Sequence, residues 1–405
     1  MTVGLTACTG GGSGDTTLTL VAADYGTSAS DSSKKYWDKL AARYEKSHPG
    51  IRIDVRVYPW SEVDSKVKGL VAAGKAPDMA QIGAYAGYAA RHKLYSADDL
   101  LSISTQSGFL TPLSQAGQVN RTQYGMPFVS STRLLFYNKT LFAKAGITAP
   151  PQSWTDLQHD ARALRKAGVK TPFALPLGPE EAQAETLMWL LSGGEGYTDN
   201  VGSYSLDSKT NVNTFDWLKT SLVGEHLTGP VAPGKLDRAD AFAGFTRGEV
   251  GMLNGHPSLM RLAGKKGVKY GMVPMPGING RAKATMGVAD WMTAFKQNGH
   301  GKEIGRFLDY VYSDRNHLAF CEEYGLLPVT ASASEKMARD PSRSDLAPFL
   351  RELPNAQLYP VGKTSWGEVS AAIKKNIGNA VSDHGNPEAI LTQLQRQAAG
   401  AEGAS

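Results

Sequence analysis

The chain has 405 residues, of which 41% are hydrophobic, and its formal net charge is +5. This length predicts two domains, each with a core large enough to fold without disulfide staples. The positive charge is spread along the sequence, whereas a nucleic-acid partner would require a concentrated basic face with interleaved aromatic rings, so we expect no such partner. No apolar run in the sequence approaches the ~20 residues that a membrane-spanning helix needs.

The N-terminus carries a short processing pattern. Residues Leu5-Thr6-Ala7-Cys8 match a lipobox, where a signal peptidase cleaves just before a cysteine that becomes lipidated. Residues 9–15 then have the Gly-rich composition of a flexible tether. The seven residues before Cys8 are fewer than a complete signal peptide has. We expect lipidation at Cys8 and an extracytoplasmic protein anchored to the outer face of the cell membrane; the alternative is a chance motif in a tail.

The next part of the chain alternates between strand and helix periodicity, an order that is typical of a parallel sheet covered by helices. The expected elements are a strand at 16–22, a helix capped by Asp31 or Ser32 and ended by His48-Pro49-Gly50, a strand at 51–57, a helix that stops at Gly74, and a strand at 79–82.

The rest of the chain continues this alternation, and capping residues mark several of its helix starts. The expected elements are a helix from Ser153 to Gly168, a helix containing Phe242 and Phe245 that breaks at Gly248, a strand at 250–253, a helix around 304–311, a helix behind the capping box Ser365–Glu368, and a last helix that starts at Asn386-Pro387.

Several short phrases occur in one order along the chain. They are YEKSHPGI at 44–51, GKAPD at 74–78, YGMPF at 124–128 with LFYNK at 135–139, FTRGEVGM at 245–252, and GLLPV at 325–329. Each phrase is weakly specific alone, but the ordered set resembles the family 1 extracellular solute-binding proteins, the maltose-binding-protein-like group. The resemblance runs from about residue 16 to the C-terminus.

The resemblance implies an α/β protein with a two-lobed periplasmic-binding-protein-like fold, in which each lobe is a mainly parallel sheet flanked by helices. Three interlobe crossings are expected near residues 130–132, 288–291 and 328–332. The implied domains are 1–15 for the lipobox and tether, 16–130 with 291–330 for lobe I, and 131–290 with 331–405 for lobe II.

The resemblance also implies the function of an extracytoplasmic solute-binding lipoprotein of an ABC transporter. Such a protein binds a sugar or oligosaccharide between its lobes and delivers it to the permease subunits in the membrane. We expect a monomer that needs no cofactor or metal and is not an enzyme, since the sequence has no G-x-S-x-G, Walker A or H-E-x-x-H motif. Adjacent carboxylates such as Glu180 and Glu181 should point apart on a regular element.

A sugar cleft needs aromatic rings against the C–H faces of the ligand and carboxylates, amides or arginines against its hydroxyls. Loops after parallel strands and residues at the crossings are the natural places for these groups. The candidates are Asp24, Tyr25 and Tyr85 after strands, Ser131, Arg133, Asp290 and Trp291 at crossings, and Glu181, Trp189, His256 and Trp366 by the resemblance.

Each candidate also has an ordinary structural interpretation as a turn, hinge or helix-packing residue. For Trp366, the sugar-stacking interpretation is preferred because this residue begins a helix instead of lying deep in its apolar face. Two functional alternatives stay open: a receptor of the same fold for a non-sugar solute such as iron or a polyamine, and a lipid-anchored glycan hydrolase. Cys321 is expected to be a small buried hydrophobe.

Overall fold

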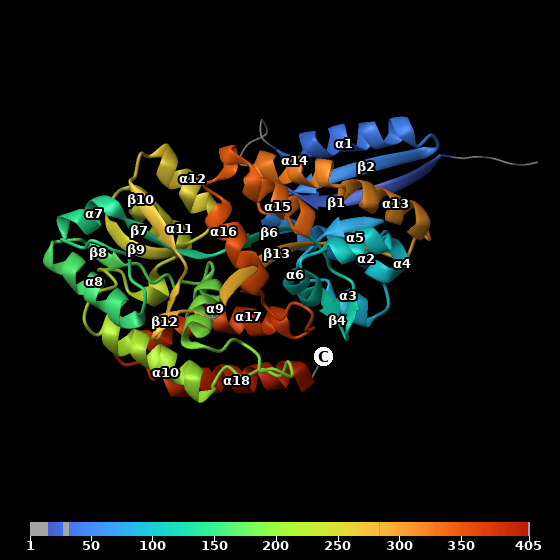
Figure 1. Cartoon of the computed structure of the whole chain (residues 1–405). Coiled ribbons are helices and arrows are strands. Elements are labelled where there is room, and N and C mark those ends of the chain that lie inside the picture. Colours follow the sequence, from blue (N-terminus) through green and yellow to red (C-terminus); the bar gives the residue numbers. More distant parts are fainter. Residues whose placement is uncertain (1–14, 27–31, 283, 404–405) are drawn as a thin grey trace, which may run out of the picture.

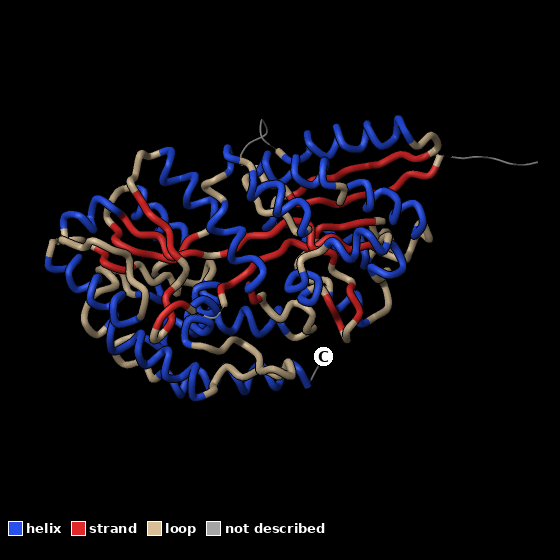
Figure 2. Tube along the Cα trace, viewed as in Figure 1, coloured by secondary structure: helices blue, strands red, loops and turns tan. Residues whose placement is uncertain are grey.

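The computed structural model of the chain describes residues 15–26, 32–282 and 284–403. These residues form two α/β lobes that lie side by side, with strands running from one lobe into the other (Figure 1, Figure 2). The two-lobed α/β fold expected from the sequence is therefore confirmed. The lipobox with Cys8, and Asp31 as an alternative helix cap, lie outside the described residues.

The bounds of the elements are as follows. The strands are β1 (Thr16–Ala23), β2 (Ile51–Tyr58), β3 (Met79–Gln81), β4 (Gln118–Val119), β5 (Thr122–Gln123), β6 (Met126–Thr132), β7 (Leu134–Asn138), β8 (Thr171–Phe173), β9 (Val250–Gly255), β10 (Tyr270–Val273), β11 (Pro276–Gly277), β12 (Gly280–Arg281), β13 (Thr285–Ala294) and β14 (Ala356–Gln357). The helices are α1 (Ser33–Ser47), α2 (Trp60–Ala72), α3 (Ala86–Ala90), α4 (Ala97–Leu100), α5 (Ile103–Gly108), α6 (Thr111–Ala116), α7 (Lys139–Lys144), α8 (Trp154–Lys166), α9 (Ala182–Gly193), α10 (Lys209–Trp217), α11 (Arg238–Thr246), α12 (Pro257–Lys265), α13 (Gly301–Val311), α14 (Asp314–Tyr324), α15 (Ala331–Arg339), α16 (Ala347–Glu352), α17 (Trp366–Asn376) and α18 (Pro387–Gly403). Short 3₁₀ or π turns are η1 (Leu218–Val223), η2 (Pro233–Lys235), η3 (Pro341–Arg343), η4 (Leu353–Asn355) and η5 (Ile377–Val381).

Lobe I is built on a sheet with the strand order β14-β13-β3-β1-β2, in which β6 also pairs with β13. The central strand β1 pairs in parallel with both β2 and β3, as the β-α-β-α-β pattern predicted. Because parallel neighbours need crossover connections, α1 and α2 carry the chain back along the sheet. The carboxyl ends of β1, β2 and β3 consequently meet at one edge of this sheet.

Helix α1 shows how the sequence pattern fixes the packing of lobe I. Its N-cap is Ser32, whose side chain accepts a hydrogen bond from the Lys34 N–H. The apolar positions at helical spacing are buried, among them Trp37, Leu40 and Tyr44. Trp37 stacks on Phe128 of β6 with a centroid distance of 5.3 Å. The predicted helix and its buried face are both confirmed.

Lobe II is built on a sheet with the strand order β10-β7-β9-β8. Strands β8 and β9 are parallel, but β7 pairs antiparallel with both β9 and β10. The pairing in this lobe is thus more mixed than expected. The reason is that β7 enters directly from β6, and so runs opposite to the strands that the lobe's own helices connect.

The β6–β13 ribbon, the antiparallel pair formed by β6 and β13, is where the three predicted crossings meet. Ser130 on β6 lies opposite Ala289 on β13. On its other side, the Ser130 N–H donates to the Leu327 carbonyl at 2.8 Å, and the Leu327 N–H donates to the Ser130 carbonyl at 3.0 Å. Three segments far apart in the sequence are therefore held side by side here. The assignment of whole segments to lobes stays a prediction.

The C-terminal helices differ from the prediction in one detail. Ser365 was expected to form a capping box with Glu368, but its side chain makes no capping hydrogen bond and its backbone is already helical. Instead the Ser365 hydroxyl is buried beside the Tyr204 hydroxyl at 3.2 Å, which removes it from the helix end. The cap at Asn386 is confirmed, since its Oδ1 accepts from the Ala389 N–H at 3.0 Å.

Burial of the remaining cysteine is also confirmed: Cys321 is fully buried and free. Within the described ranges, no helix combines the length and the apolar composition that crossing a bilayer would require.

Phe307 tests the packing of lobe I, because its ring is 0% exposed on α13 and contacts Tyr44 of α1 at a centroid distance of 5.0 Å. Phe307→Ala should lower the free energy of unfolding by ~3–5 kcal/mol, since it leaves a cavity between two helices. Ile103→Ala is the control, because Ile103 is 85% exposed and should change stability by no more than about 0.5 kcal/mol. Chemical denaturation measures both, and equal effects would contradict the described packing.

Candidate functional site

One face of the β6–β13 ribbon is open to solvent. Ser131, Val288 and Asp290 are partly exposed, whereas their neighbours along each strand are buried. Ser131 lies opposite Val288, and side chains alternate between faces along a strand, so these three side chains share one face. Arg133 continues the same alternation just beyond β6. The sequence-predicted residues Ser131, Arg133 and Asp290 are therefore brought together.

This face has two ends. Gly287 pairs with Thr132, so the position opposite Arg133 is Met286, which is four residues from Asp290. At ~3.3 Å per residue, Arg133 and Asp290 are ~13 Å apart along the ribbon. Each end carries a separate group of polar and aromatic side chains, one from lobe I and one from lobe II.

The lobe I end is organised by Tyr25, which follows β1. Its hydroxyl donates to Asp290 Oδ2 at 2.8 Å and accepts from Gln81 Nε2 at 3.4 Å. Its ring is packed edge-on against Trp60 at 5.5 Å and Phe320 at 5.3 Å. Trp60 begins α2 directly after β2 and is 36% exposed. The meeting of β1, β2 and β3 thus places an exposed indole beside the Tyr25–Asp290 pair.

The two acids at this end have different environments. Burial raises the pKa of Asp290 to about 6, although the hydrogen bond from Tyr25 acts in the opposite direction. Burial also raises the pKa of Asp24, but hydrogen bonds from Ser33, Ser32 and Gly26 lower it by more, so the net pKa lies below the usual value. Asp24 therefore stabilises the start of α1, in agreement with its alternative interpretation as a turn residue.

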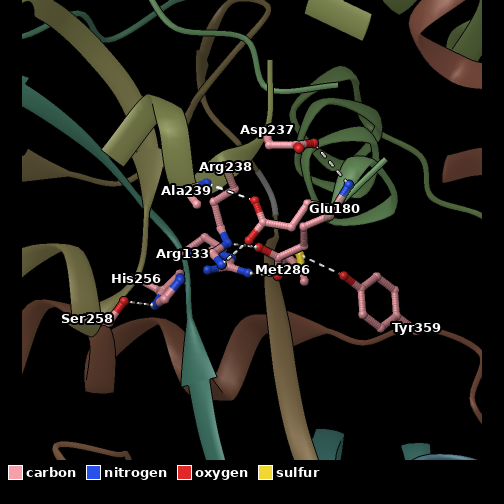
Figure 3. A network of polar contacts seen from close by, with 10 residues as sticks. Arg133, Glu180, Asp237, Arg238, Ala239, His256, Ser258, Met286 and Tyr359 are labelled. Atoms are coloured by element: carbon pink, nitrogen blue, oxygen red, sulfur yellow. Dashed lines mark hydrogen bonds and ion pairs between the residues drawn. The ribbon is translucent and has the colours of Figure 1, made fainter. Parts of the chain in front are cut away.

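The lobe II end is an ion-pair network of two arginines and two glutamates (Figure 3). Arg133 Nη2 lies 2.6 Å from Glu181 Oε1, and Arg238 Nε lies 2.6 Å from Glu181 Oε2. Arg238 also pairs with Glu180, whose Oε2 accepts from the Ala239 N–H at 2.8 Å. The network joins the end of β6, the loop before α9 and the start of α11.

Glu180 and Glu181 would point apart on a regular element, but neither residue lies inside one. Both carboxylates bind the guanidinium of Arg238. The expectation holds for regular elements, but Glu180 lies in a loop and Glu181 is the residue before α9. Irregular backbone lets neighbouring side chains converge on one cation.

Trp366 is separated from the ribbon by Tyr359. It is 9% exposed and stacks on Tyr359 with a centroid distance of 5.2 Å and an interplanar angle of 24°. Tyr359 is partly exposed, and its hydroxyl contacts the sulfur of Met286 at 3.8 Å, opposite Arg133 on the ribbon. The ring that reaches the ribbon is therefore Tyr359, with Trp366 supporting it.

Four other residues that were predicted to contact the ligand are not part of the open face. Some lie away from this face and some lie beside it. Tyr85 and Trp291 are buried against each other at 5.7 Å, and the Tyr85 hydroxyl donates to the Ala116 carbonyl. Trp189 is fully buried and donates to Glu185 Oε1 at 2.8 Å. His256 is partly exposed at the start of α12 and contacts the ring of Phe242 at 5.2 Å.

Sequence reasoning missed Trp60, Arg238 and Tyr359. A signal existed for Trp60, because it follows the carboxyl end of a predicted parallel strand. Arg238 and Tyr359 had none, since each reaches the ribbon from a segment distant in sequence. Among the residues that the structure describes, no three His, Cys, Asp or Glu side chains are grouped so that they could hold a metal ion.

Comparison with known proteins gives consistent results. The model of the family described as "Bacterial extracellular solute-binding protein" matches residues 29–317. A Brucella abortus protein named only as a binding protein is 26% identical over 371 residues, which cover 90% of this chain and 89% of that protein. The sn-glycerol-3-phosphate-binding periplasmic protein of Pectobacterium atrosepticum is 25% identical over 338 residues, covering 74% of this chain and 71% of its own. The crystal structure of the cyclic alpha-maltosyl-1,6-maltose binding protein from Arthrobacter globiformis matches with a TM-score of 0.81 at 16% identity, covering 97% of this chain and 100% of that one.

The raised pKa of Asp290 predicts a pH-dependent stability. The folded protein holds this proton more tightly than the unfolded chain does, so the contribution is fully present below the unfolded pKa of 3.8 and is lost as the pH rises through about 6. Asp290→Asn stays neutral at every pH. Its melting temperature should therefore rise relative to wild type between about pH 4 and about pH 7.5.

Tyr25→Phe is the companion variant for this measurement. It removes the hydrogen bond that lowers the pKa of Asp290, so the loss of stability should extend to higher pH than in wild type. Thermal melts across the pH range test both statements. A difference between wild type and Asp290→Asn that does not change with pH would contradict them.

Proposed function

The chain belongs to the family of bacterial extracellular solute-binding proteins, and from this premise we propose that it binds a sugar or oligosaccharide on the open face of the β6–β13 ribbon and delivers it to an ABC permease. The observation that carries the proposal is the makeup of that face. Polar groups line it from Asp290 to Arg133, and an aromatic ring stands at each end, Trp60 with Tyr25 in lobe I and Tyr359 in lobe II. Hydroxyls and C–H faces of a sugar need this combination.

The charges at the lobe II end of the site favour a neutral ligand. Arg133 and Arg238 carry two positive charges, and Glu180 and Glu181 carry two negative charges that already pair with them. A phosphate binds best to cations and N–H groups that are not already neutralised. A polyamine would meet two guanidinium groups here. A relative of this chain is named for sn-glycerol 3-phosphate, but the balanced network supports a sugar over a phosphorylated polyol.

The arrangement supports binding without turnover. The family and the structural neighbours are binding proteins. The two glutamates nearest the ribbon, Glu180 and Glu181, are held in ion pairs with Arg133 and Arg238. We propose that these two carboxylates orient the hydroxyls of the ligand.

We also propose that Cys8 carries a lipid anchor. The support is the lipobox pattern and the Gly-rich segment that follows it. The first described strand, β1, begins at Thr16, so the tether would separate the folded lobes from the membrane by residues 9–15. A receptor tethered in this way stays within reach of its permease, which raises their effective concentration.

A ligand screen tests the proposed function. A sugar that binds only the folded protein should raise its melting temperature by mass action. The set is glucose, galactose, maltose, cellobiose, lactose and sn-glycerol 3-phosphate. We expect at least one sugar to stabilise the protein more than the phosphorylated polyol does. Stabilisation by sn-glycerol 3-phosphate alone would replace the sugar proposal with the phosphate one.

Two tryptophan variants locate the site. Trp60→Ala should weaken sugar binding by about tenfold, which corresponds to ~1.4 kcal/mol, because an exposed ring is removed from the lobe I end of the open face. Trp217→Ala is the matched control: Trp217 packs on Trp154 at 4.6 Å and Trp189 at 5.8 Å inside lobe II. It should lower the melting temperature and leave affinity within about twofold. Titration calorimetry that gives the reverse pattern would remove Trp60 from the site.

Membrane association tests the anchor. When the chain is produced in a bacterium with a functional leader sequence in front of it, the wild type should fractionate with membranes. Cys8→Ala should release it to the soluble fraction, because the thioether-linked lipid can no longer form. Cys321→Ala is the control, since that thiol is buried and should not affect fractionation. Equal fractionation of wild type and Cys8→Ala would refute the anchor.

A further inference from the structure

A narrow pocket opens beside the lobe II end of the ribbon. Its volume is about 20 Å³, and its wall includes Arg133, Glu181, Glu185, Arg238 and Asn254. A cavity of about 10–15 Å³ is enough for one water-sized group. The side chains of Glu181 and Arg238 are 24% and 29% exposed, whereas Arg133, Glu185 and Asn254 are each at most 6% exposed. The pocket therefore has a partly exposed rim, formed by Glu181 and Arg238, and a buried polar floor.

Asn254, which lines this pocket, carries an acceptor that nothing in the described structure satisfies. Asn254 Nδ2 donates to Glu185 Oε1 at 2.9 Å, and the Trp189 N–H donates to the same oxygen at 2.8 Å. The amino group of Asn254 therefore faces the carboxyl group of Glu185. Asn254 Oδ1 is then left buried without a hydrogen-bond partner. A buried acceptor without a partner costs about 1–3 kcal/mol, so the site gains from any donor that enters.

The wall chemistry selects what can enter. Two guanidinium groups oppose a cation, and the carboxylates of Glu181 and Glu185 oppose an anion. A methyl group would leave Asn254 Oδ1 unpaired. A hydroxyl satisfies all of these groups, because it donates one hydrogen bond and accepts others. Burial raises the pKa of Glu185 to about 7, so near neutral pH this floor residue can face a hydroxyl in either protonation state.

We propose that this pocket is a specificity site that takes one hydroxyl group of the bound sugar, with Asn254 Oδ1 as the acceptor of its proton. The proposal rests on the proposed sugar-binding function and goes beyond it by naming the group recognised and the residue that recognises it. Arg133 makes the connection, since it lies at the end of the open ribbon face and also lines the pocket. A sugar lying on the ribbon can therefore insert one substituent while its ring stays in the cleft.

The test is a cycle of protein and ligand changes. The variant is Asn254→Leu, because leucine is nearly isosteric with asparagine and has no acceptor. Wild type and variant are both titrated with the disaccharide of the screen that stabilises wild type most. They are then titrated with each monodeoxy analogue of that disaccharide. In wild type, one analogue should bind at least about tenfold more weakly than its parent. In Asn254→Leu, the parent should bind about tenfold more weakly, and that same analogue should no longer differ from it. Asn213→Leu, an exposed position on α10, is the matched control and should keep the wild-type profile.

Each result bears on the proposal. If wild type binds no sugar of the set, the proposed function fails and this inference falls with it. If wild type binds sugar but the two proteins show the same profile of deoxy analogues, only the pocket assignment is overturned. A crystal structure of the wild-type protein with bound sugar tests the pocket assignment even if Asn254→Leu does not fold. A sugar hydroxyl should lie within about 3 Å of Asn254 Oδ1, and a water molecule there, with the sugar elsewhere, would overturn the inference.

Discussion

The structure depends on the antiparallel pairing of β6 with β13. Each strand begins or ends in a different lobe, and Ser130 at its centre also exchanges hydrogen bonds with Leu327, so the backbone of three distant segments is satisfied at one place. Buried backbone groups must be paired, so these three segments cannot separate without leaving buried groups unpaired. The two faces of the β6–β13 ribbon have different environments. One is buried by Trp291 and its neighbours, and the other is left partly open with Ser131, Val288 and Asp290.

Electrostatic compensation is the second organising feature. Ions taken out of water are costly unless partners replace the water. Arg133, which is buried, meets this condition through Glu181, and Arg238 links Glu181 to Glu180. The result is a rigid set of donors and acceptors with no net charge. Such a set recognises hydroxyl groups by geometry.

The aromatic residues at the two ends of the open face divide into those that reach this face and those that hold them in place. Trp60 and Tyr359 are partly exposed, and each is backed by another ring, Tyr25 for the first and Trp366 for the second. Contacts between rings restrict the conformations that an exposed side chain can adopt, and so lower the entropy lost when a ligand binds. The buried indoles of Trp189 and Trp291 contribute to the site only through the residues that they support.

The sequence by itself determined the local elements and the family. Strict alternation at 51–57 and the spacing of Trp37, Leu40 and Tyr44 specify which face is buried, because that information repeats with the period of the backbone. It also pointed to Ser131, Arg133 and Asp290, which follow or lie within crossings. Only the tertiary structure decided that Glu180 and Glu181 converge on Arg238, that Tyr359 lies between Trp366 and the ribbon, and that Asn254 Oδ1 is left without a partner. These facts depend on contacts between residues at least 57 positions apart in the sequence. No local periodicity encodes the direction in which a loop side chain points once such segments pack together.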